Sequence, residues 1–160
     1  MNHIWSPWRM EYIEKSKEDG CVFCIAQEME DGAENLIAFR GKHSYVILNR
    51  YPYTSGHLMV VPLEHKAHLE DLDQPTRAEM MELTTRCIVV LRKIYHPEAF
   101  NMGANIGESA GAGVKSHVHI HIVPRWLGDT NFMTVVGDVR VLPEALERTY
   151  ERVRSVFLEG

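Results

Sequence analysis

The chain has 160 residues, 45% hydrophobic and 24% charged, which is the composition of an ordinary folded soluble domain. Its formal net charge of -5 disfavours binding to a nucleic acid polymer, whereas a small phosphorylated ligand needs only a few local donors. No stretch approaches the roughly 20 apolar residues of a membrane span, and residues 1–15 lack the pattern of an export signal. We therefore expect a cytoplasmic protein with no membrane segment and no nucleic acid polymer as partner.

The N-terminal residues are expected to form an arm that packs on the body of the protein or on a second subunit, since they hold Trp5 and Trp8 around Pro7. Cys21 and Cys24 follow at a CxxC spacing, which would place two sulfurs on one tight turn within reach of one metal ion. Thioredoxin-type redox motifs share this spacing. Because the chain has an odd number of cysteines and no export signal, a metal site or plain thiols are favoured over disulfides.

Apolar runs predict the first strands of a sheet. Residues 36–40 and 43–49, separated by Gly41, are expected to form a hairpin, and residues 57–62 a buried strand. A short charged helix is expected over 64–72.

A long helix is predicted to begin at Asp73 or Gln74, with Pro75 in its first turn, and to end before Pro97. Its apolar residues recur at three- and four-residue steps, which is typical of a helix that buries one face in the core.

Residues 100–106 are expected to form a strand, followed by a glycine-rich turn over 107–113. Glycine lets backbone N–H groups crowd around an anion, so this turn is either a phosphate-contacting loop, the interpretation that its position favours, or an ordinary flexible hairpin loop. It is not a Walker loop, because the Lys-Ser/Thr ending is missing. Beyond it, a weak strand is expected over 134–141, and Pro143 opens a last helix with an apolar stripe of Leu146, Tyr150, Val153 and Phe157.

The stretch from Ser116 to Trp126 reads SHVHIHIVPRW. In a strand, His117, His119 and His121 would project from one face and the alternating apolar residues from the other. Pro124 should end that strand and leave Arg125 and Trp126 in a loop. Such a row of imidazoles suits a hydrogen-bonded polar face, a metal site, or catalysis in which one imidazole attacks phosphorus while its neighbours handle protons.

The motif HVHIHIV resembles the His-φ-His-φ-His-φ-φ signature of the histidine triad (HIT) family of nucleotide hydrolases and transferases. LNRYPYTSGHLMVVPLEH (48–65) is similar to the second block of that family, and NIGESAGAG (105–113) to its phosphate loop. The resemblance implies an α+β, HIT-like fold with an about five-stranded, mostly antiparallel sheet, one long helix and a C-terminal helix. It also implies a homodimer and one HIT-like domain over 1–160, divided into an arm (1–20), a catalytic core (21–126) and a C-terminal extension and helix (127–160).

The resemblance also implies roles for the histidines and their neighbours. His119 would be the nucleophile that forms a nucleotidyl-histidine, His121 would donate to a phosphate or leaving-group oxygen, and His117 would support the site. The carried-over nucleotide-binding positions are Asn49 at the ribose, Asn105, Gly111, Gly113 and Ser116 at the phosphate, His57 behind the triad, Trp126 near the ligand or a second subunit, and Phe23 with the apolar neighbours of Asn49 at the base. The chain departs from relatives that carry a polar side chain in the phosphate loop, where it has Gly111-Ala112-Gly113.

Zinc-bearing relatives hold their metal with a CxxC pair, a histidine after the second block and the first histidine of the triad. Carried over, this gives Cys21, Cys24, His65 and His117 as zinc ligands, with His68 as the alternative to His65. Zinc would then be a structural cofactor.

The function implied by the resemblance is cleavage of adenine dinucleotides or AMP-linked substrates at the α-phosphate. The continuation PRWLGDTNF is similar to that of bacterial members of the family that cleave diadenosine tetraphosphate by phosphorolysis. Two alternatives remain open at this point: a nucleotide-binding regulatory module with little turnover, and a metal-dependent hydrolase that uses the three histidines as ligands. The sequence does not decide whether water or phosphate is the acceptor.

Overall fold

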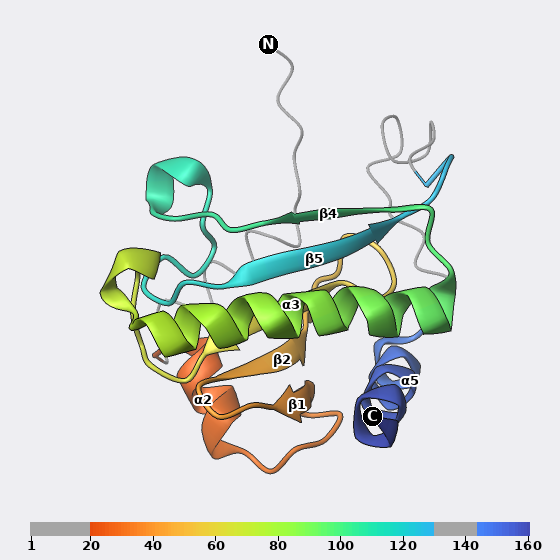
Figure 1. Ribbon diagram of the computed structural model, residues 1–160, viewed down its shortest axis with the longest axis horizontal. Helices are drawn as coiled ribbons and strands as arrows, with labels where there is room; N and C mark the ends of the chain where they lie inside the picture. Colours follow the sequence, from red (N-terminus) through yellow and green to blue (C-terminus); the bar gives the residue numbers. More distant parts are fainter. Residues whose placement is uncertain (1–19, 130–143) are drawn as a thin grey trace.

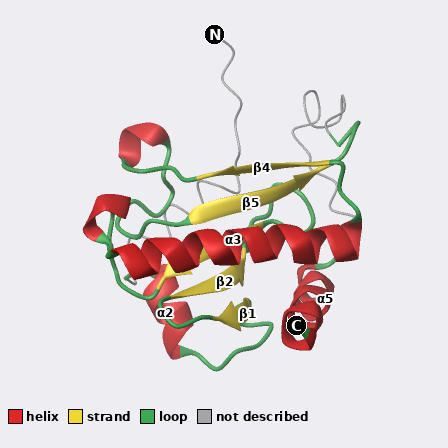
Figure 2. Ribbon diagram, viewed as in Figure 1, coloured by secondary structure: helices red, strands yellow, loops and turns green. Residues whose placement is uncertain are grey.

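The computed structural model describes residues 20–129 and 144–160, and it confirms the α+β prediction within them. The sheet has five strands in the order β1-β2-β3-β5-β4, and all neighbouring strands are antiparallel (Figures 1 and 2). The expected N-terminal arm and the expected strand at 134–141 lie outside the described residues. The strands are β1 (Ile37–Arg40), β2 (Ser44–Leu48), β3 (Leu58–Pro62), β4 (Ala99–Gly103) and β5 (Ile120–Arg125).

The long helix α3 (Gln74–Tyr95) has the ends that its sequence predicts. The Asp73 carboxylate accepts a hydrogen bond from the backbone N–H of Thr76 at 2.8 Å, which satisfies one donor of the first turn. At the other end, His96 adopts a left-handed conformation with φ of 48° and stops the helix. No helix within the described residues is long and apolar enough to cross a membrane.

The remaining helical elements are shorter than α3. They are α2 (Val22–Glu28), α5 (Leu146–Glu159), and the single-turn 3-10 helices η1 (Leu69–Asp71) and η2 (Glu108–Ala110). Within α5, Tyr150, Val153 and Phe157 are buried, as the predicted apolar stripe requires.

One face of the sheet forms the main core. Val46, Val60 and Ile122 come from three adjacent strands and are completely buried. Helix α3 contacts β2, β3 and β5, while α5 contacts β1 and α3, and Figure 1 shows α3 lying across the sheet with α5 beside it. Burial of this face against two helices stabilises the sheet that carries the site, at roughly 25 cal/mol per Å² of apolar surface.

The opposite face of the sheet carries the candidate site. Ile47, Met59 and His121 stand opposite one another in the strand register and therefore share this face. Helix α2 lies on the same side, because the Phe23 ring packs against the rings of His117 and His119. The hydroxyl of Tyr45 donates to the carbonyl of Phe23 at 2.9 Å and ties α2 to β2.

The histidine strand is shorter at its start and longer at its end than the sequence predicts. Pairing with β3 stops at Val60 and Ile120, so His117 and His119 precede β5, and the N–H of Val118 donates instead to the carbonyl of Lys66 at 2.7 Å. Pro124 does not end the strand but pairs with Phe100.

Pro124 is tolerated in β5 because of the side of the strand that it faces. Its carbonyl accepts from the hydroxyl of Thr54, which belongs to the loop before β3. Since the N–H and C=O of one strand residue face the same side, the missing N–H points away from β4 and no ladder hydrogen bond is lost.

Three further predictions need correction. Cys21 caps α2 and Cys24 lies in its first turn, so the CxxC pair sits on a helix and not on a tight turn. The expected helix over 64–72 is reduced to the single turn η1, and the strand expected over 100–106 is β4, which ends at Gly103. The glycine-rich loop contains the short helix η2.

Candidate active site and metal centre

The triad histidines lie at the start of β5, where the rings of His119 and His121 are in contact and the Phe23 ring packs against those of His117 and His119. The ring centroids of His119 and His121 are 4.7 Å apart at an angle of 70°, and the Phe23 ring lies 4.8 Å from that of His119. His117 is completely buried, His119 is 4% exposed and His121 is half-buried. Although only His121 belongs to β5, the structure places His119 against His121 and joins His117 to His119 through the Phe23 ring.

A backbone carbonyl orients His119. Its Nδ1 lies 2.9 Å from the carbonyl oxygen of His117, and a carbonyl only accepts, so Nδ1 carries the proton. The lone pair of the neutral ring is therefore on Nε2. Burial lowers the pKa of His119, although the bond to the carbonyl acts in the opposite direction. Burial thus favours the uncharged imidazole, and the bond to the carbonyl fixes which of its nitrogens can attack an electrophile.

His117 is oriented in the opposite sense. Its Nε2 lies 2.9 Å from the carbonyl oxygen of Pro62, so Nε2 is protonated and the lone pair is on Nδ1. Nδ1 faces the sulfur of Cys21 at 3.3 Å. Burial lowers the pKa of His117, which keeps the ring neutral as a metal ligand must be.

Cys21, Cys24, His65 and His117 form a compact cluster whose ligand atoms all lie within 4.8 Å of one another. Nδ1 of His65 is 3.2 Å from the sulfur of Cys24, and Nδ1 of His117 is 3.7 Å from it. A tetrahedral zinc ion with bonds of about 2.0–2.3 Å would separate its ligands by about 3.3–3.8 Å. The donor set and spacing therefore fit zinc, and the structure selects His65 over His68.

The surroundings of Cys24 disfavour its thiolate form. Burial, together with the neighbouring sulfur of Cys21, raises the pKa of Cys24 to about 11. A cation between the sulfurs would favour the thiolate instead, and this is what a zinc ion supplies.

Behind the triad stands His57, which is 1% exposed. Its Nε2 lies 2.9 Å from Nδ1 of His121, and its Nδ1 accepts a hydrogen bond from the backbone N–H of Tyr53 at 3.2 Å. The Tyr53 ring lies 4.7 Å from that of His57. The structure thus places His57 directly against the third triad histidine.

Asn49 is adjacent to His57 at the end of the β2–β3 pair. Its Oδ1 accepts from the backbone N–H of Tyr51 at 2.9 Å, and its Nδ2 lies 3.4 Å from Nδ1 of His57. Phe23, which the resemblance implies at the base, is 3% exposed and packs against two triad rings. The Phe23 ring is thus part of the surroundings of the triad as well as of the hydrophobic core.

The predicted phosphate positions lie in the segment between β4 and His117. Asn105 follows β4, Gly111 caps η2 with φ of 83°, and Gly113 and Ser116 are exposed just before the triad. Because this segment leads directly into His117, the chain connectivity holds it at the start of β5.

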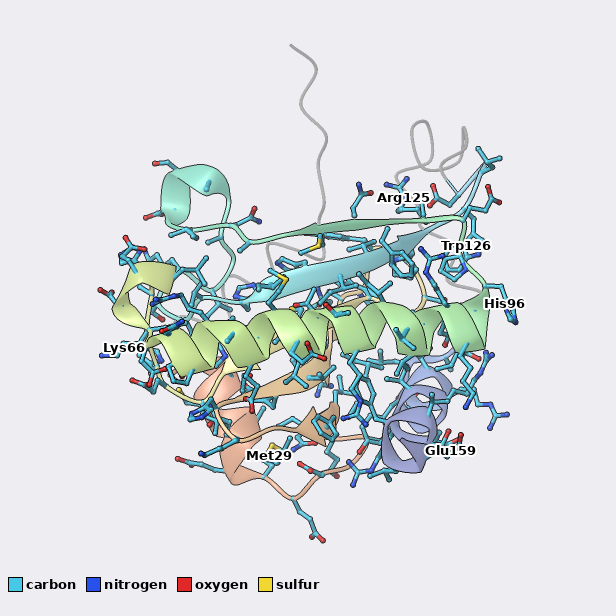
Figure 3. All side chains as sticks on the ribbon, viewed as in Figure 1. Met29, Lys66, His96, Arg125, Trp126 and Glu159 are labelled. Carbon is cyan, nitrogen blue, oxygen red and sulfur yellow. The ribbon has the colours of Figure 1, made fainter. Side chains whose placement is uncertain are left out.

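Trp126 lies at the other end of β5, next to Arg125 (Figure 3). Five residues of extended chain separate it from His121, which is about 16 Å. Arg125 is bonded to Asp129 and Asn101, and the N–H of Trp126 also donates to Asp129. A contact between Trp126 and a nucleotide at His119 thus requires a ligand that runs along β5 or a second copy of the chain.

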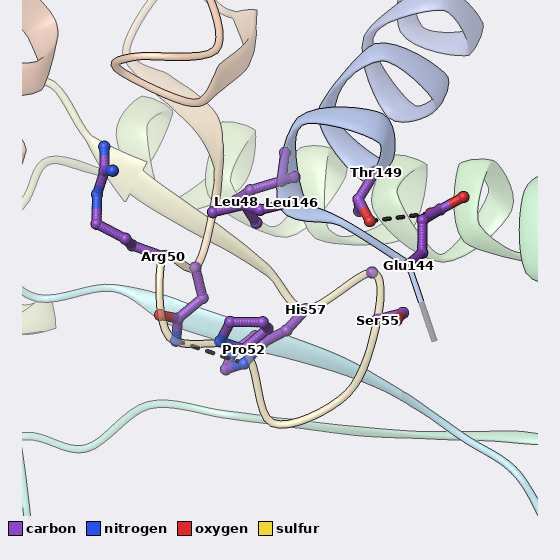
Figure 4. A pocket seen from close by; sticks show the side chains of 10 residues that line it. Leu48, Arg50, Pro52, Ser55, His57, Glu144, Leu146 and Thr149 are labelled. Carbon is purple, nitrogen blue, oxygen red and sulfur yellow. Dashed lines mark hydrogen bonds between the residues drawn. The ribbon is translucent and has the colours of Figure 1, made fainter. Parts of the chain in front are cut away.

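A separate small cavity lies between the loop after β2 and the start of α5 (Figure 4). Its volume is about 90 Å³, and Leu48, Ser55, His57, Leu146 and Thr149 are among its lining residues. Leu48 belongs to the core face of the sheet, so this cavity lies behind His57 and not in front of His119. The hydroxyl of Ser55 is buried here without a hydrogen-bond partner among the described residues.

Two backbone groups of the site could not be found from side-chain identities. The N–H of Tyr53 and the carbonyl of Pro62 each set the protonated nitrogen of a histidine. Every residue other than proline has both groups, so only the fold reveals which of them point at a ring. The nearest signal in the sequence is the loop around Pro52 that closes at Gly56, whose φ is 83°.

Fold and site together define a histidine triad protein, with the His119 imidazole oriented by the backbone carbonyl of His117 and a Cys₂His₂ cluster beside it. The chain belongs to the HIT family, since the HIT domain family model matches residues 32–126.

Several relatives are similar over most of the chain. An AP-4-A phosphorylase of Mycobacterium tuberculosis is 39% identical, and the alignment covers 93% of this chain and 80% of that protein. A bis(5'-nucleosyl)-tetraphosphatase [asymmetrical] of Schizosaccharomyces pombe is 28% identical, over 78% of this chain and 64% of that protein. Among solved structures, a Zn-bound histidine triad family protein from Mycobacterium smegmatis matches with a TM-score of 0.70 and 28% identity, covering 88% of this chain and 94% of that one.

Proposed function

We propose that this protein is a nucleotidyl hydrolase or transferase that cleaves adenine dinucleotides, such as diadenosine tetraphosphate, or AMP-linked substrates at the α-phosphorus. The observation that carries the proposal is the bond from His119 Nδ1–H to the His117 carbonyl, which leaves the Nε2 lone pair for attack. Similarity to an AP-4-A phosphorylase and to a bis(5'-nucleosyl)-tetraphosphatase supports the substrate class.

The reaction has two displacement steps at phosphorus. Nε2 of His119 attacks the α-phosphorus, the bond to the bridging oxygen breaks, and a nucleotidyl-histidine forms. His121 donates a proton or a hydrogen bond to the departing oxygen. An acceptor then attacks the same phosphorus, its own proton is lost, and the bond to His119 breaks.

The identity of the acceptor distinguishes a phosphorylase from a hydrolase. Water would release AMP, whereas inorganic phosphate would release ADP. We favour phosphate, because the chain is 39% identical to a protein named AP-4-A phosphorylase. The leaving group is ATP in both cases, so the second mononucleotide product of diadenosine tetraphosphate turnover, with and without phosphate, separates the two. AMP and ATP without ADP in saturating phosphate would contradict our assignment.

The test of the mechanism is replacement of the nucleophile. His119→Asn should abolish turnover and leave AMP binding largely intact, because asparagine cannot form the covalent intermediate. His96→Asn is the matched control: His96 is exposed, has φ of 48° at the end of α3, and asparagine tolerates that conformation. Rapid quenching should trap an acid-labile nucleotidyl-histidine in the wild type. Tight AMP binding without any turnover of a dinucleotide panel would favour the regulatory-module alternative.

We further propose that Cys21, Cys24, His65 and His117 hold a structural zinc ion. The fit of the four ligand atoms supports this, as does the zinc found in the M. smegmatis relative. The cluster requires reduced thiols, which agrees with a cytoplasmic location. Elemental analysis should find about one zinc per chain in the wild type and a lower content in Cys21→Ser, with nucleotide binding at the triad retained.

The tautomers argue against a metal ion held by the three triad histidines. Nδ1 of His119 donates to a carbonyl, Nε2 of His117 donates to another, and Nδ1 of His121 faces His57. Because each ring already uses one nitrogen in a contact with a protein group, the three rings do not direct three lone pairs at one ion. Chelator-resistant cleavage would agree with this interpretation, provided that the fold survives loss of zinc.

We propose that the protein forms a homodimer through β4 and the adjoining side of α3. Strand β4 is at the edge of the sheet, where an unpaired row of backbone groups can accept a second strand. Met102 on β4 is 49% exposed and Val89 on α3 is 61% exposed. Sedimentation analysis should give a dimer, and Met102→Glu should shift the distribution toward monomer.

A further inference from the structure

We infer that Asn49 is a positioning residue that keeps the His57–His121 pair neutral, with the proton of each ring on Nε2. Its amide would then serve proton donation by His121 as well as any contact with the ribose. The catalytic consequence rests on the proposed function, but the protonation pattern itself does not.

The orientation of the Asn49 amide follows from one backbone group. The N–H of Tyr51 points at one terminal atom of the side chain at 2.9 Å. A backbone N–H only donates, so that atom is the oxygen and the other is the NH₂ group. The NH₂ group therefore faces Nδ1 of His57, at 3.4 Å.

Two donors converge on Nδ1 of His57, and both require it to be unprotonated. They are the Asn49 NH₂ and the backbone N–H of Tyr53, at 3.4 and 3.2 Å. The proton of a neutral His57 must then be on Nε2, which lies 2.9 Å from Nδ1 of His121. Nδ1 of His121 accepts this proton's hydrogen bond, and the proton of His121 is on Nε2.

The surrounding structure holds this arrangement in place. The N–H of Asn49 donates to the carbonyl of His57 at 3.0 Å, so the two residues face each other across the strand pair. His57 is 1% exposed, which leaves little room for solvent to replace either donor.

Other charged and titratable groups also lie near His57. Tyr53 packs on the ring, while Arg50 and Glu144 line the cavity behind it. Glu144 is bonded to Arg152 and Thr149, so its charge is directed toward α5.

An aspartate in place of Asn49 would favour a proton on Nδ1 of His57. The new side chain would be isosteric with the amide and keep the oxygen that faces Tyr51, but a carboxylate oxygen would now face the lone pair of His57 Nδ1. A proton taken up from solvent on Nδ1 removes this conflict and turns His57 into an imidazolium. The choice of amide over carboxylate thus determines whether the pair is neutral or charged.

The test is the protonation state of the histidine rings, measured by long-range ¹H–¹⁵N NMR on the full-length protein without substrate. In the wild type at pH 7, His57 should show an unprotonated Nδ1 and a protonated Nε2, and His121 the same pattern. In Asn49→Asp, both nitrogens of His57 should be protonated at pH 7, with its titration midpoint raised by at least one pH unit. Asn101→Asp, which adds a charge to the same face of the sheet, should leave His57 unchanged.

A proton on Nδ1 of His57 in the wild type would overturn the inference, and that measurement needs no variant. Unchanged His57 resonances in folded Asn49→Asp would overturn it as well. Kinetics adds an independent readout: Asn49→Ala should act mainly on KM, whereas Asn49→Asp should also change the pH dependence of kcat. If the tautomers are as described but no dinucleotide is cleaved, the proposed function fails and this inference stands.

Discussion

The effect of replacing Glu79 on the free energy of unfolding can be worked out from its hydrogen bonds. Glu79 lies on α3 and its carboxylate accepts three hydrogen bonds from the β1–β2 turn: the backbone N–H groups of Lys42 and His43, at 2.8 and 2.7 Å, and the hydroxyl of Ser44, at 2.8 Å. Glu79→Gln keeps one carbonyl oxygen but turns an NH₂ group toward donors of the turn. We expect this change to weaken the attachment of the turn to the helix.

The magnitude follows from the number of bonds and their exposure. Hydrogen bonds to a charged group contribute about 1.5–3 kcal/mol each, and because Glu79 is only half-buried we take about 1 kcal/mol for each bond, below that range. Loss or weakening of two bonds should destabilise the protein by about 2 kcal/mol, or about 4–8 °C in Tm for a chain of this size.

The effect should depend on pH. Burial opposes ionisation of Glu79, but the hydrogen bonds from Ser44, His43 and Lys42 outweigh it and lower the pKa below the usual 4.5. A lowered folded-state pKa stabilises the protein above the unfolded value, and this stability is lost as the pH falls through the folded pKa. The gap between wild type and Glu79→Gln should therefore be full at pH 7 and close below pH 4.5.

Urea denaturation at several pH values measures both quantities. Glu82→Gln is the matched control, since Glu82 is exposed on the same helix and its replacement should change the stability by less than about 0.5 kcal/mol. A Glu79→Gln protein as stable as the wild type at pH 7, or a stability gap that does not depend on pH, would refute the reasoning.

Three further changes test the β1–β2 turn, the cavity behind His57 and the Cys/His cluster. Gly41→Ala should destabilise by about 1–3 kcal/mol in the same denaturation assay, because a Cβ would lie 2.9 Å from the Glu79 carboxyl group and from the Ser44 carbonyl oxygen. Ser55→Ala should stabilise by about 1 kcal/mol, as it removes a buried hydroxyl without a partner among the described residues. Removal of the proposed zinc by a chelator should lower the Tm of the wild type by about 5–10 °C and that of Cys24→Ser by much less, as scanning calorimetry would show.

Periodic apolar patterns predicted most of the fold. The limits of α3 follow from its Asp73 cap and from the residues that bury its face, and these are local properties of the chain. The positions of the first three strands were also predicted to within a residue or two at each end. The histidine strand was predicted less well, because its start depends on where β3 stops pairing, which no local pattern contains.

The Cys/His cluster and the histidine contacts likewise depend on tertiary contacts that no local sequence pattern contains. The CxxC spacing indicated a pair of sulfurs, but only the fold brings His65 and His117 within reach of them. Likewise, the pattern of alternating histidines indicated a shared face, whereas the protonated nitrogen of each ring depends on backbone groups that are distant in sequence, such as the Pro62 carbonyl for His117. Residue identity indicated candidate side chains, and tertiary contacts determine which of their atoms face one another.

His117 contributes to both the Cys/His cluster and the triad. Its side chain faces Cys21 and Cys24, while its carbonyl oxygen orients His119. Loss of activity in a His117 variant would consequently be ambiguous between a chemical defect and a collapsed scaffold. A mutational scan of this segment can assign a direct part in bond making only to positions whose replacement leaves the Cys/His cluster intact. His119 is such a position, because it is not one of the four residues of the cluster.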